Sequence, residues 1–319
     1  MSKEKEDQKQ DTGKYRTNTK DQFYTSPVVA KKCIQILISA LHDVVLYSPV
    51  LPLSSYLWVE PSAGNGAFLN NIPETYDKIG IDIEPVGGAG YANIIKQDFL
   101  TWVPPAQKTK TNQKPVIIFG NPPFGRQSSL AKAFIVHSCK FPSTSTIAFI
   151  LPRSFVKPSM SSAFDLHFHC IHSSEVEHNA FVLGGGDASY DVPCVFQIWQ
   201  KRSVPRIVPE KITEKGFQYV KETDPRDIVI RRVGVYAGRC FDSGGGGAGA
   251  GDINSATEYN KQTHYFIKLD EQFVAAQHVK QIVDNINAHV FPTNTTGPRS
   301  LSKPEINDVL NAVLMFVLS

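Results

Sequence analysis

Short apolar runs that end in turn-forming residues recur through the first two thirds of the chain, and they constrain its fold more than any other feature. Each run is unbroken and rich in β-branched or aromatic residues, as expected of strands buried in a parallel sheet. The four clearest runs are Tyr56–Val59, Ile79–Ile81, Val116–Phe119 and Ile147–Leu151. Helical segments such as residues 128–140 fit between them, so we predict an α/β fold with a doubly wound, mostly parallel sheet.

Signals at both ends of these runs assign the sheet domain to residues 21–200. We expect a helix to begin at Pro27 after an N-cap at Ser26, because apolar residues then follow at helical spacing. At the far end, residues 181–183 and 192–199 flank a Gly-rich segment, which predicts an antiparallel hairpin on the edge of the sheet.

The segments outside this domain differ in composition. Residues 1–20 contain almost no apolar side chains and are predicted to form a disordered tail. Residues 201–319 are predicted to form a smaller C-terminal region that helps to bind substrate. Its first part, Lys201 to Cys240, holds ten Lys and Arg against five Asp and Glu. Residues 243–252 are expected to form a flexible Gly-rich loop, and the capping-box spacing of Ser302 and Glu305 predicts a last helix.

The tetrapeptide Asn121-Pro122-Pro123-Phe124 carries the strongest chemical signal. It follows a predicted strand and therefore lies at a carboxyl strand end, where open α/β sheets bind ligands. Two successive prolines lack N–H donors, which leaves carbonyl acceptors beside the amide oxygen of Asn121. With the flat ring of Phe124, these acceptors suit an NH2 group on a planar ring system. A rigid turn with a packed phenylalanine is the structural alternative.

Polar groups follow the neighbouring strands in the same way. Residues 60–68 follow the first strand, and their glycines let a ligand approach the backbone. This segment has neither the third glycine of a dinucleotide fingerprint nor the lysine of a P-loop. Asp82 ends the second strand, where an acid can accept both hydroxyls of a ribose. Asp98 follows the third strand and can accept from an adenine amino group, with Phe99 against the ring.

In their order along the chain, these motifs resemble those of S-adenosylmethionine-dependent amino-methyltransferases. The matching segments are Tyr24 to Pro27, Glu60 to Phe68, Ile81 to Pro85, Asp98-Phe99 and Asn121 to Phe124. The set is most similar to N6-adenine DNA methyltransferases whose cofactor motifs precede the catalytic one, and much of the chain resembles phage or large-virus members. The resemblance covers residues 21–200 and implies a class I methyltransferase fold, in which a mostly parallel sheet finishes in one antiparallel strand.

The resemblance also implies a role for each matching residue. The residues that would bind the cofactor S-adenosylmethionine are Tyr24, Thr25, Glu60, Pro61, Ala63, Gly64, Gly66, Asp82, Asp98 and Phe99. Thr25 would hold the methionine carboxylate, Glu60 would lie near the cofactor's amino acid end, and Asp82 would bind the ribose. Asp98 and Phe99 would bind the adenine. The catalytic residues would be Asn121, Pro122, Pro123 and Phe124.

The implied reaction is methylation of the exocyclic N6 amino group of adenine in DNA. If Asn121 and the Pro122 carbonyl accept hydrogen bonds from both N–H groups of that amino group, they would localise a lone pair that is otherwise delocalised into the ring. A base paired in a duplex cannot reach such a site, so it must be flipped out or single-stranded. An amino group in RNA, a protein glutamine and a binding fold without turnover are the alternatives, and only the resemblance favours DNA over RNA.

Three arginines are weaker candidates for binding substrate. Arg153 follows a predicted strand end, where it can contact a phosphate or form a structural ion pair. Arg231 and Arg232 lie in a basic, Gly-containing turn, which suits backbone phosphates or a solvated positive face.

A dense group of metal-ligating residue types lies near the end of the sheet domain: His167, His169, Cys170 and His172. Their spacing permits a metal site, but no motif supplies a fourth ligand and the expected methyl transfer needs no metal. We therefore predict ordinary strand histidines and no metal.

Composition limits the partners and the compartment. The net charge of +3 neither requires nor excludes a nucleic-acid partner. Five scattered cysteines without a C-x-x-C pair indicate reduced thiols. No apolar run is long enough to span a membrane, and the charged N-terminus lacks the apolar core of a signal peptide. We expect a cytoplasmic protein, in the host cytoplasm if it is viral, with nucleic acid as partner and no membrane association.

Overall fold

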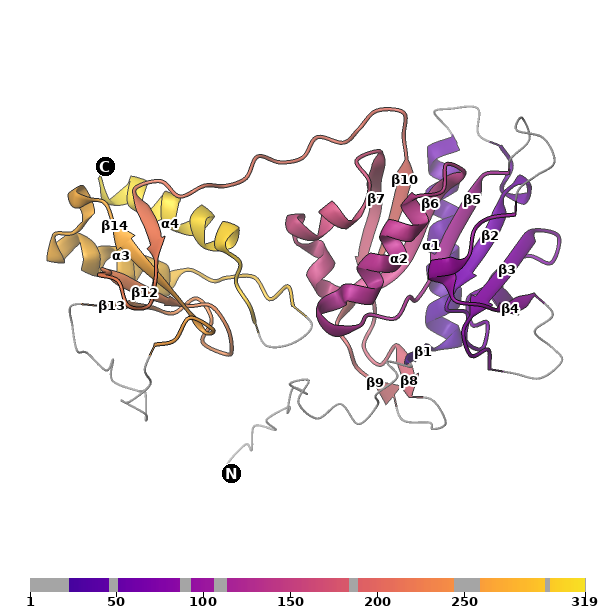
Figure 1. The fold of residues 1–319 in the computed structure, drawn as a ribbon, viewed down its shortest axis with the longest axis horizontal. Helices are drawn as coiled ribbons and strands as arrows, with labels where there is room; N and C mark the ends of the chain where they lie inside the picture. The colour runs from indigo at the N-terminus through magenta and orange to yellow at the C-terminus, as the bar shows by residue number, and fades with distance from the viewer. Residues whose placement is uncertain are drawn as a thin grey trace, which may run out of the picture. The chain divides into compact units, whose positions relative to one another are not determined.

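The computed structural model describes residues 23–45, 51–86, 93–105, 114–183, 189–243, 259–295 and 299–318. The chain divides into two compact units between Val208 and Pro209 (Figure 1). The predicted tail, residues 1–20, lies outside the described residues, as does the predicted Gly-rich loop beyond Ser243. Within the described ranges, no helix has both the length and the apolar character needed to cross a membrane.

A seven-stranded sheet of order β4-β3-β2-β5-β6-β10-β7 forms the first unit. Its strands are β2 (Leu57–Pro61), β3 (Asp77–Asp82), β4 (Ile94–Lys96), β5 (Val116–Gly120), β6 (Thr144–Pro152), β7 (Phe168–Glu175) and β10 (Cys194–Lys201). Strands β2 to β6 pair in parallel, whereas β10 is antiparallel to both β6 and β7. Numbered along the chain, the order is 3-2-1-4-5-7-6 with only the last strand reversed, which is the class I methyltransferase fold.

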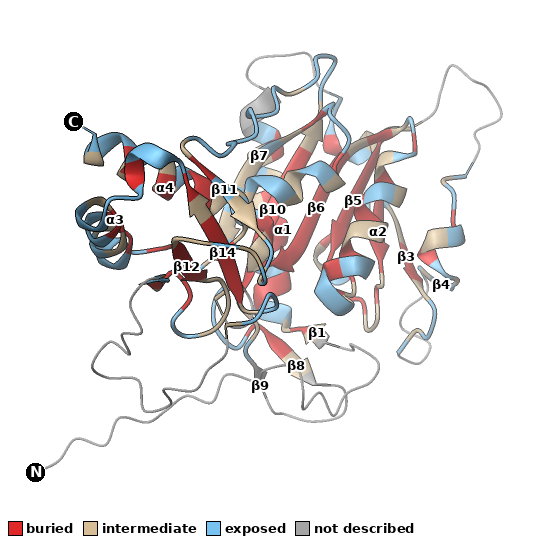
Figure 2. Cartoon of the chain, turned by 60° about the vertical axis from the view of Figure 1, so that its left-hand side comes forward, coloured by how far each residue is buried: buried red, intermediate tan, exposed pale blue. Residues whose placement is uncertain are grey.

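The central strands are buried because they are apolar on both faces. Every residue of β5 is buried, and residues 147–151 of β6 are completely inaccessible to solvent (Figure 2). Helices α1 (Pro27–Val45) and α2 (Ser129–Cys139) add residues to the same core. Ser26 caps α1 as predicted, since its Oγ accepts a hydrogen bond from the Val29 N–H at 3.3 Å. Losing one large buried side chain from such a core typically costs about 2–5 kcal/mol.

The edge hairpin contains a different first strand from the one we predicted. Strand β10 pairs with β7 and β6, and residues 181–183 do not take part. They form β8 (Phe181–Leu183), which joins β1 (Phe23–Thr25) and β9 (Ser189–Tyr190) in a separate three-stranded sheet. The histidines of β7 were predicted to lie on a strand, but the place of that strand in the sheet was not predicted, because polar residues interrupt this half-exposed strand and leave it without an apolar run.

The chain that leaves β10 stays attached to the first unit as far as Arg206. The Arg206 guanidinium donates four hydrogen bonds of 2.5–3.0 Å to the carbonyl oxygens of Ser161, Phe164, Asp165 and Phe168. It also lies 5.5 Å from the centre of the Trp199 ring, which stacks on Phe164 at 3.9 Å. The boundary that we predicted, between residues 200 and 201, falls inside β10 and before this anchor.

The second unit combines a four-stranded antiparallel sheet of order β11-β14-β12-β13 with two helices. These elements are β11 (Phe217–Val220), β12 (Ile228–Arg231), β13 (Cys240–Asp242), β14 (His264–Leu269), α3 (Ala276–Ala288) and α4 (Lys303–Val317). Ile230 and Ile267 of the sheet share one core with Ile282 and Ile306 of the helices. The predicted capping box starts α4, because Glu305 Oε2 accepts from the backbone N–H of Ser302 at 2.8 Å.

Short 3-10 helices complete the described structure, at Leu53–Ser55, Leu69–Asn71, Phe99–Thr101, Arg126–Ser128, Arg153–Val156, Pro158–Ala163 and Glu271–Phe273.

Candidate active site

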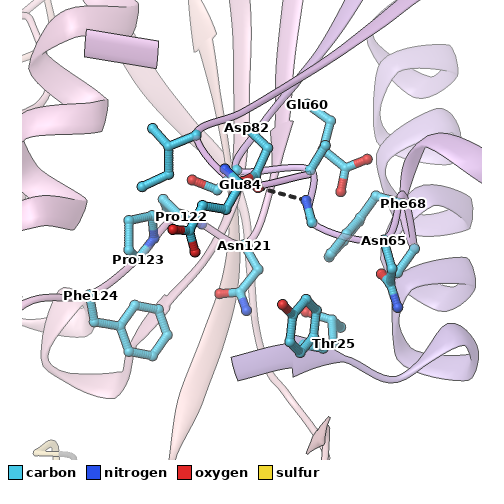
Figure 3. A pocket seen from close by; sticks show the side chains of 16 residues that line it. Thr25, Glu60, Asn65, Phe68, Asp82, Glu84, Asn121, Pro122, Pro123 and Phe124 are labelled. Carbon is cyan, nitrogen blue, oxygen red and sulfur yellow. Dashed lines mark hydrogen bonds between the residues drawn. The ribbon is translucent and has the colours of Figure 1, made fainter. Parts of the chain in front are cut away.

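A cavity of about 390 Å³ lies at the carboxyl ends of β2, β3 and β5 (Figure 3). Because parallel strands end at the same edge of a sheet, loops that are far apart in the sequence meet there. Ten of the residues predicted to form the site line this cavity: Tyr24, Thr25, Glu60, Ala63, Gly64, Asp82, Asn121, Pro122, Pro123 and Phe124.

The loop after β2 is shaped to bring its backbone against the cavity. Gly64 has a φ of +51°, and a Cβ added to it would lie 3.0 Å from a ring carbon of Tyr24, so this position favours glycine. Ser62 also adopts a left-handed backbone, with a φ of 57°, at a cost of order 1–3 kcal/mol. Pro61 and Gly66 do not line the cavity, and the Gly66 N–H closes the loop on the Ala63 carbonyl at 2.6 Å.

Asp82 ties two cavity loops together from the end of β3. Its Oδ2 accepts from the Gly64 N–H at 2.8 Å, and its Oδ1 accepts from the Glu84 N–H at 2.7 Å. Each carboxylate oxygen has a second lone pair. Asp82 can therefore hold the two loops and still accept a hydrogen bond from a hydroxyl group of a ligand.

Glu60 is the buried acid of the site, with only 2% of its surface exposed. Its Oε2 accepts a hydrogen bond from the Leu69 N–H at 2.7 Å. Burial raises the pKa of the Glu60 carboxyl to about 8, although the backbone N–H groups of Leu69 and Phe68 oppose the shift. A cation placed in the cavity would favour the ionised form of this carboxyl.

Thr25 presents a buried hydroxyl to the cavity from β1. The residue is 5% exposed, and its Oγ1 has no hydrogen-bond partner within the described part of the chain. Pairing with Phe181 of β8 fixes the Thr25 backbone. An unsatisfied buried hydroxyl costs about 1–3 kcal/mol, and a hydrogen bond from a ligand would offset that cost.

The segment after β5 forms the opposite end of the cavity. The amide of Asn121 points into the space between Thr25 and Phe124 (Figure 3). The carbonyl oxygens of Pro122 and Pro123 accept no hydrogen bond from any described residue. Phe124 is anchored to the start of α2, where the Leu130 N–H donates to its carbonyl at 3.2 Å. The acceptors are thus held in place before a ligand arrives.

Two residues predicted to bind the cofactor's adenine lie outside the cavity lining. Asp98 is exposed, and its Oδ1 accepts from the Leu100 N–H at 2.9 Å to cap a 3-10 helix. Phe99 is 2% exposed and packs 5.0 Å from the Phe134 ring in the core. The adenine contact of Phe99 stays a prediction, and in this structure its ring belongs to the core.

The three arginine candidates have different surroundings. Arg153 forms an ion pair with Glu175 of β7, so the structural alternative describes it better than a phosphate contact. Arg231 and Arg232 belong to the second unit. Arg232 lies 4.8 Å from the centre of the buried Tyr265 ring, whereas Arg231 lies 5.8 Å from the exposed Tyr236 ring. Of this pair, Arg231 is the one beside an exposed surface.

The histidine group on and beside β7 forms ordinary local hydrogen bonds. His167 Nδ1 bonds to Asp165 at 3.1 Å, His169 Nε2 to the Val204 carbonyl at 2.8 Å and His172 Nε2 to Ser174 at 2.9 Å. In the part of the chain that the structure describes, no three His, Cys, Asp or Glu side chains are arranged to hold a metal ion.

Sequence reasoning missed six residues that line the cavity: Ser62, Asn65, Ala67, Phe68, Ile83 and Glu84. All six lie inside the two segments that carried the cofactor motifs, so the signal was present in the segments as wholes. The motifs emphasise glycines and acids, whereas the left-handed backbone of Ser62, which aims this loop, has no signature in sequence.

Comparisons with known proteins give only distant likenesses. No family model matches the chain, and no curated protein is significantly similar to it. Similar solved structures include the 23S rRNA methyltransferase ErmE, with 14% identity and a TM-score of 0.40 over 58% of this chain and 71% of that one. A Thermoplasma acidophilum protein has 13% identity and a TM-score of 0.37, over 56% and 96%. A Plasmodium falciparum dimethyladenosine transferase has 15% identity and a TM-score of 0.35, over 57% and 64%. At these values the likeness carries no argument about activity, and the strand order itself defines the fold.

Proposed function

We propose that this protein transfers a methyl group from S-adenosylmethionine to the exocyclic N6 amino group of adenine in DNA. One observation carries the proposal: a single cavity combines an acceptor end, formed by Asn121 and Pro122, with a polar end that holds Thr25 and Asp82. The acceptor end suits an amino group, and the polar end suits a nucleoside that carries a carboxylate.

The polar end of the cavity fits S-adenosylmethionine. The Thr25 hydroxyl, which has no partner among the described residues, and the backbone around Gly64 would hold the methionine carboxylate. Asp82 would accept hydrogen bonds from the ribose hydroxyls. Glu60 would face the ammonium group, which favours its ionised form. The cavity volume lies in the range of small-molecule sites. When bound, the cofactor would supply an electrophilic methyl group.

The acceptor end prepares the amino group. The Asn121 amide oxygen and the Pro122 carbonyl oxygen would accept hydrogen bonds from its two N–H groups, which returns the nitrogen lone pair from the ring to the reacting atom. Phe124 gives this end an apolar wall that helps to exclude water. The chain therefore contributes positioning and electrostatics, and it forms no covalent bond to the substrate.

The acceptor end fits exocyclic amino groups of more than one macromolecule. DNA is placed first because Tyr24-Thr25 and the Glu-Pro-Ser-Ala-Gly segment that begins at Glu60 resemble the N6-adenine DNA enzymes. An amino group in RNA is the second candidate, because the same acceptor end serves any exocyclic amino group. A protein glutamine is the third, since its amide nitrogen also carries two N–H groups that can donate hydrogen bonds.

Transfer of a labelled methyl group tests the proposal directly. The full chain is incubated with methyl-labelled S-adenosylmethionine and separate DNA, RNA and protein acceptors, and mass spectrometry identifies the modified group. We expect N6-methyladenine in DNA. The Asn121→Ala variant should lose the product, whereas Asn70→Ala, an exposed asparagine outside the cavity lining, should keep it. Product in RNA or protein alone would replace the acceptor, and the absence of cofactor binding by calorimetry would refute the function.

A further inference from the structure

One turn of the second unit presents an exposed aromatic ring between arginines. We define the Tyr236 turn as residues 231–239, which connect β12 to β13. Tyr236 is 53% exposed and its neighbour Val235 is 84% exposed. The guanidinium carbons of Arg231 and Arg239 lie 5.8 and 6.0 Å from the centre of the Tyr236 ring. Packing of the unit's own core does not account for this arrangement, because both side chains at the tip point into solvent.

Backbone hydrogen bonds and packing hold the Tyr236 turn in one conformation. The Arg231 N–H donates to the Arg239 carbonyl at 2.8 Å, and the Gly238 N–H donates to the Arg231 carbonyl at 2.7 Å. Gly238 has a φ of +101°, and a Cβ added to it would lie 2.4 Å from the buried Phe291 ring. The backbone of the Tyr236 turn is therefore preorganised, which lowers the entropy cost of binding a partner there.

The charge of the turn favours an anionic partner. Residues 228–241 contain three arginines and no acidic residue. The acid that precedes them, Asp227, is paired with Lys268 at 2.9 Å. Guanidinium groups form paired hydrogen bonds with phosphate oxygens, and exposed aromatic rings stack on bases of any sequence. A cationic surface with an exposed ring matches the alternating phosphates and bases of a polynucleotide.

We propose that the Tyr236 turn binds a nucleic-acid strand, with Arg231 and Arg239 on its phosphates and Tyr236 stacked on a base. A base offers its face only where it is unstacked, so the turn selects a single strand or a locally opened duplex. Val235 adds an apolar contact beside the same base. The inference rests on the proposed function only in taking the bound strand to be the methyl acceptor, since the binding itself needs no methyl transfer.

Salt dependence of binding tests the arginines. The full chain is titrated with fluorescently labelled oligonucleotides, as single-stranded DNA, single-stranded RNA, paired duplex and mismatched duplex, at several salt concentrations. Replacing Arg231 and Arg239 together by Gln should lower the log–log salt slope on single strands by about 1.4, since each phosphate contact contributes about 0.7. The matched control replaces Lys261 and Lys280, two exposed cations of the same unit, by Gln and should keep the wild-type slope.

Ring substitutions test the stacking. Tyr236→Ala should weaken single-strand binding roughly 5- to 150-fold, whereas Tyr236→Phe keeps the ring and should bind nearly as the parent does. Thermal melting of both variants checks the fold, which an exposed position should leave intact. The mismatched duplex should bind more tightly than the paired one in the parent and lose that preference in Tyr236→Ala.

Several results would overturn the proposal. These are a salt slope unchanged in the arginine variant, an equal loss in the lysine control, or equal binding by Tyr236→Ala and Tyr236→Phe. Displacement of the oligonucleotide by polyglutamate at equal charge concentration would show that the turn recognises acidic protein instead. A chain that binds oligonucleotides through this turn but transfers no methyl group would count against the proposed function alone. Cofactor affinity, measured in the same variants, should stay at the parent value.

Discussion

The two units assemble their candidate contacts in different ways. In the first unit, the parallel strands β2, β3 and β5 all end at one edge, so loops from residues 60–68, 82–84 and 121–124 form one cavity. In the second unit, the sheet is antiparallel, and successive strands end at opposite edges. Its candidate contacts therefore come from a single turn of nine residues, 231–239. A cavity built from distant segments depends on the whole core, whereas the turn depends mainly on its own backbone hydrogen bonds and local packing.

The largest effect expected is the loss of turnover in Asn121→Ala. Removing one preorganised polar group at a reacting centre typically lowers turnover by roughly 10²- to 10³-fold. Cofactor affinity should change by less than about threefold, because Asn121 lies at the acceptor end. Steady-state kinetics with the acceptor varied up to saturation should distinguish the roles of the two units, since Tyr236→Ala should lose acceptor affinity and keep most of its turnover. Loss of cofactor binding in Asn121→Ala would instead make the segment structural.

Asp82→Ala should weaken cofactor binding roughly 10- to 150-fold, the range expected for a hydrogen bond to a charged group. The loops tied by Asp82 should also loosen, because the Gly64 and Glu84 N–H groups lose their acceptor. Calorimetric titration of the cofactor gives the affinity. Asp77→Ala is the matched control, since Asp77 begins the same strand at the opposite edge of the sheet. Equal losses in the two variants would remove Asp82 from the site.

The buried Glu60 should make the stability of the first unit depend on pH. Its pKa is about 8 in the folded chain against an ordinary value of 4.5, so the folded state binds more protons between these values. The free energy of unfolding should fall as pH rises across this window, by at most about 1.4 kcal/mol per pH unit. Glu60→Gln should remove that slope, whereas Glu74→Gln, an exposed control, should retain it. Urea unfolding at pH 5, 6, 7 and 8 measures the difference.

The smallest effect should come from Arg153→Gln. The pair with Glu175 is partly exposed, with 29% and 71% of the two side chains accessible, so the free energy of unfolding should fall by less than about 1 kcal/mol. The salt slope of oligonucleotide binding should not move, in contrast to the arginines of the Tyr236 turn. A slope reduced by about one unit would return Arg153 to the phosphate-binding residues.

The sequence predicted the parts of the fold that depend on local apolar runs. Strands β2, β3, β5 and β6 were predicted because each contains a short apolar run that ends in turn-forming residues. The place of β7 in the sheet was missed because its pairing with β10 is a long-range contact that its polar residues do not indicate. The same limit explains Phe99, since a phenylalanine beside a motif gives no sign of whether it faces a ligand or the core. The short strands of the second unit also depend on distant pairing, as β12 pairs with β14.

The Arg206 anchor bears on how the two units can be separated or exchanged. A fragment that ends at Val208 keeps the guanidinium on its four carbonyl oxygens and its cover over Trp199. A fragment that ends at residue 200 removes that donor and uncovers an aromatic pair, which favours aggregation. Another C-terminal unit should therefore be joined after residue 208, because a junction there leaves the surface of the first unit intact.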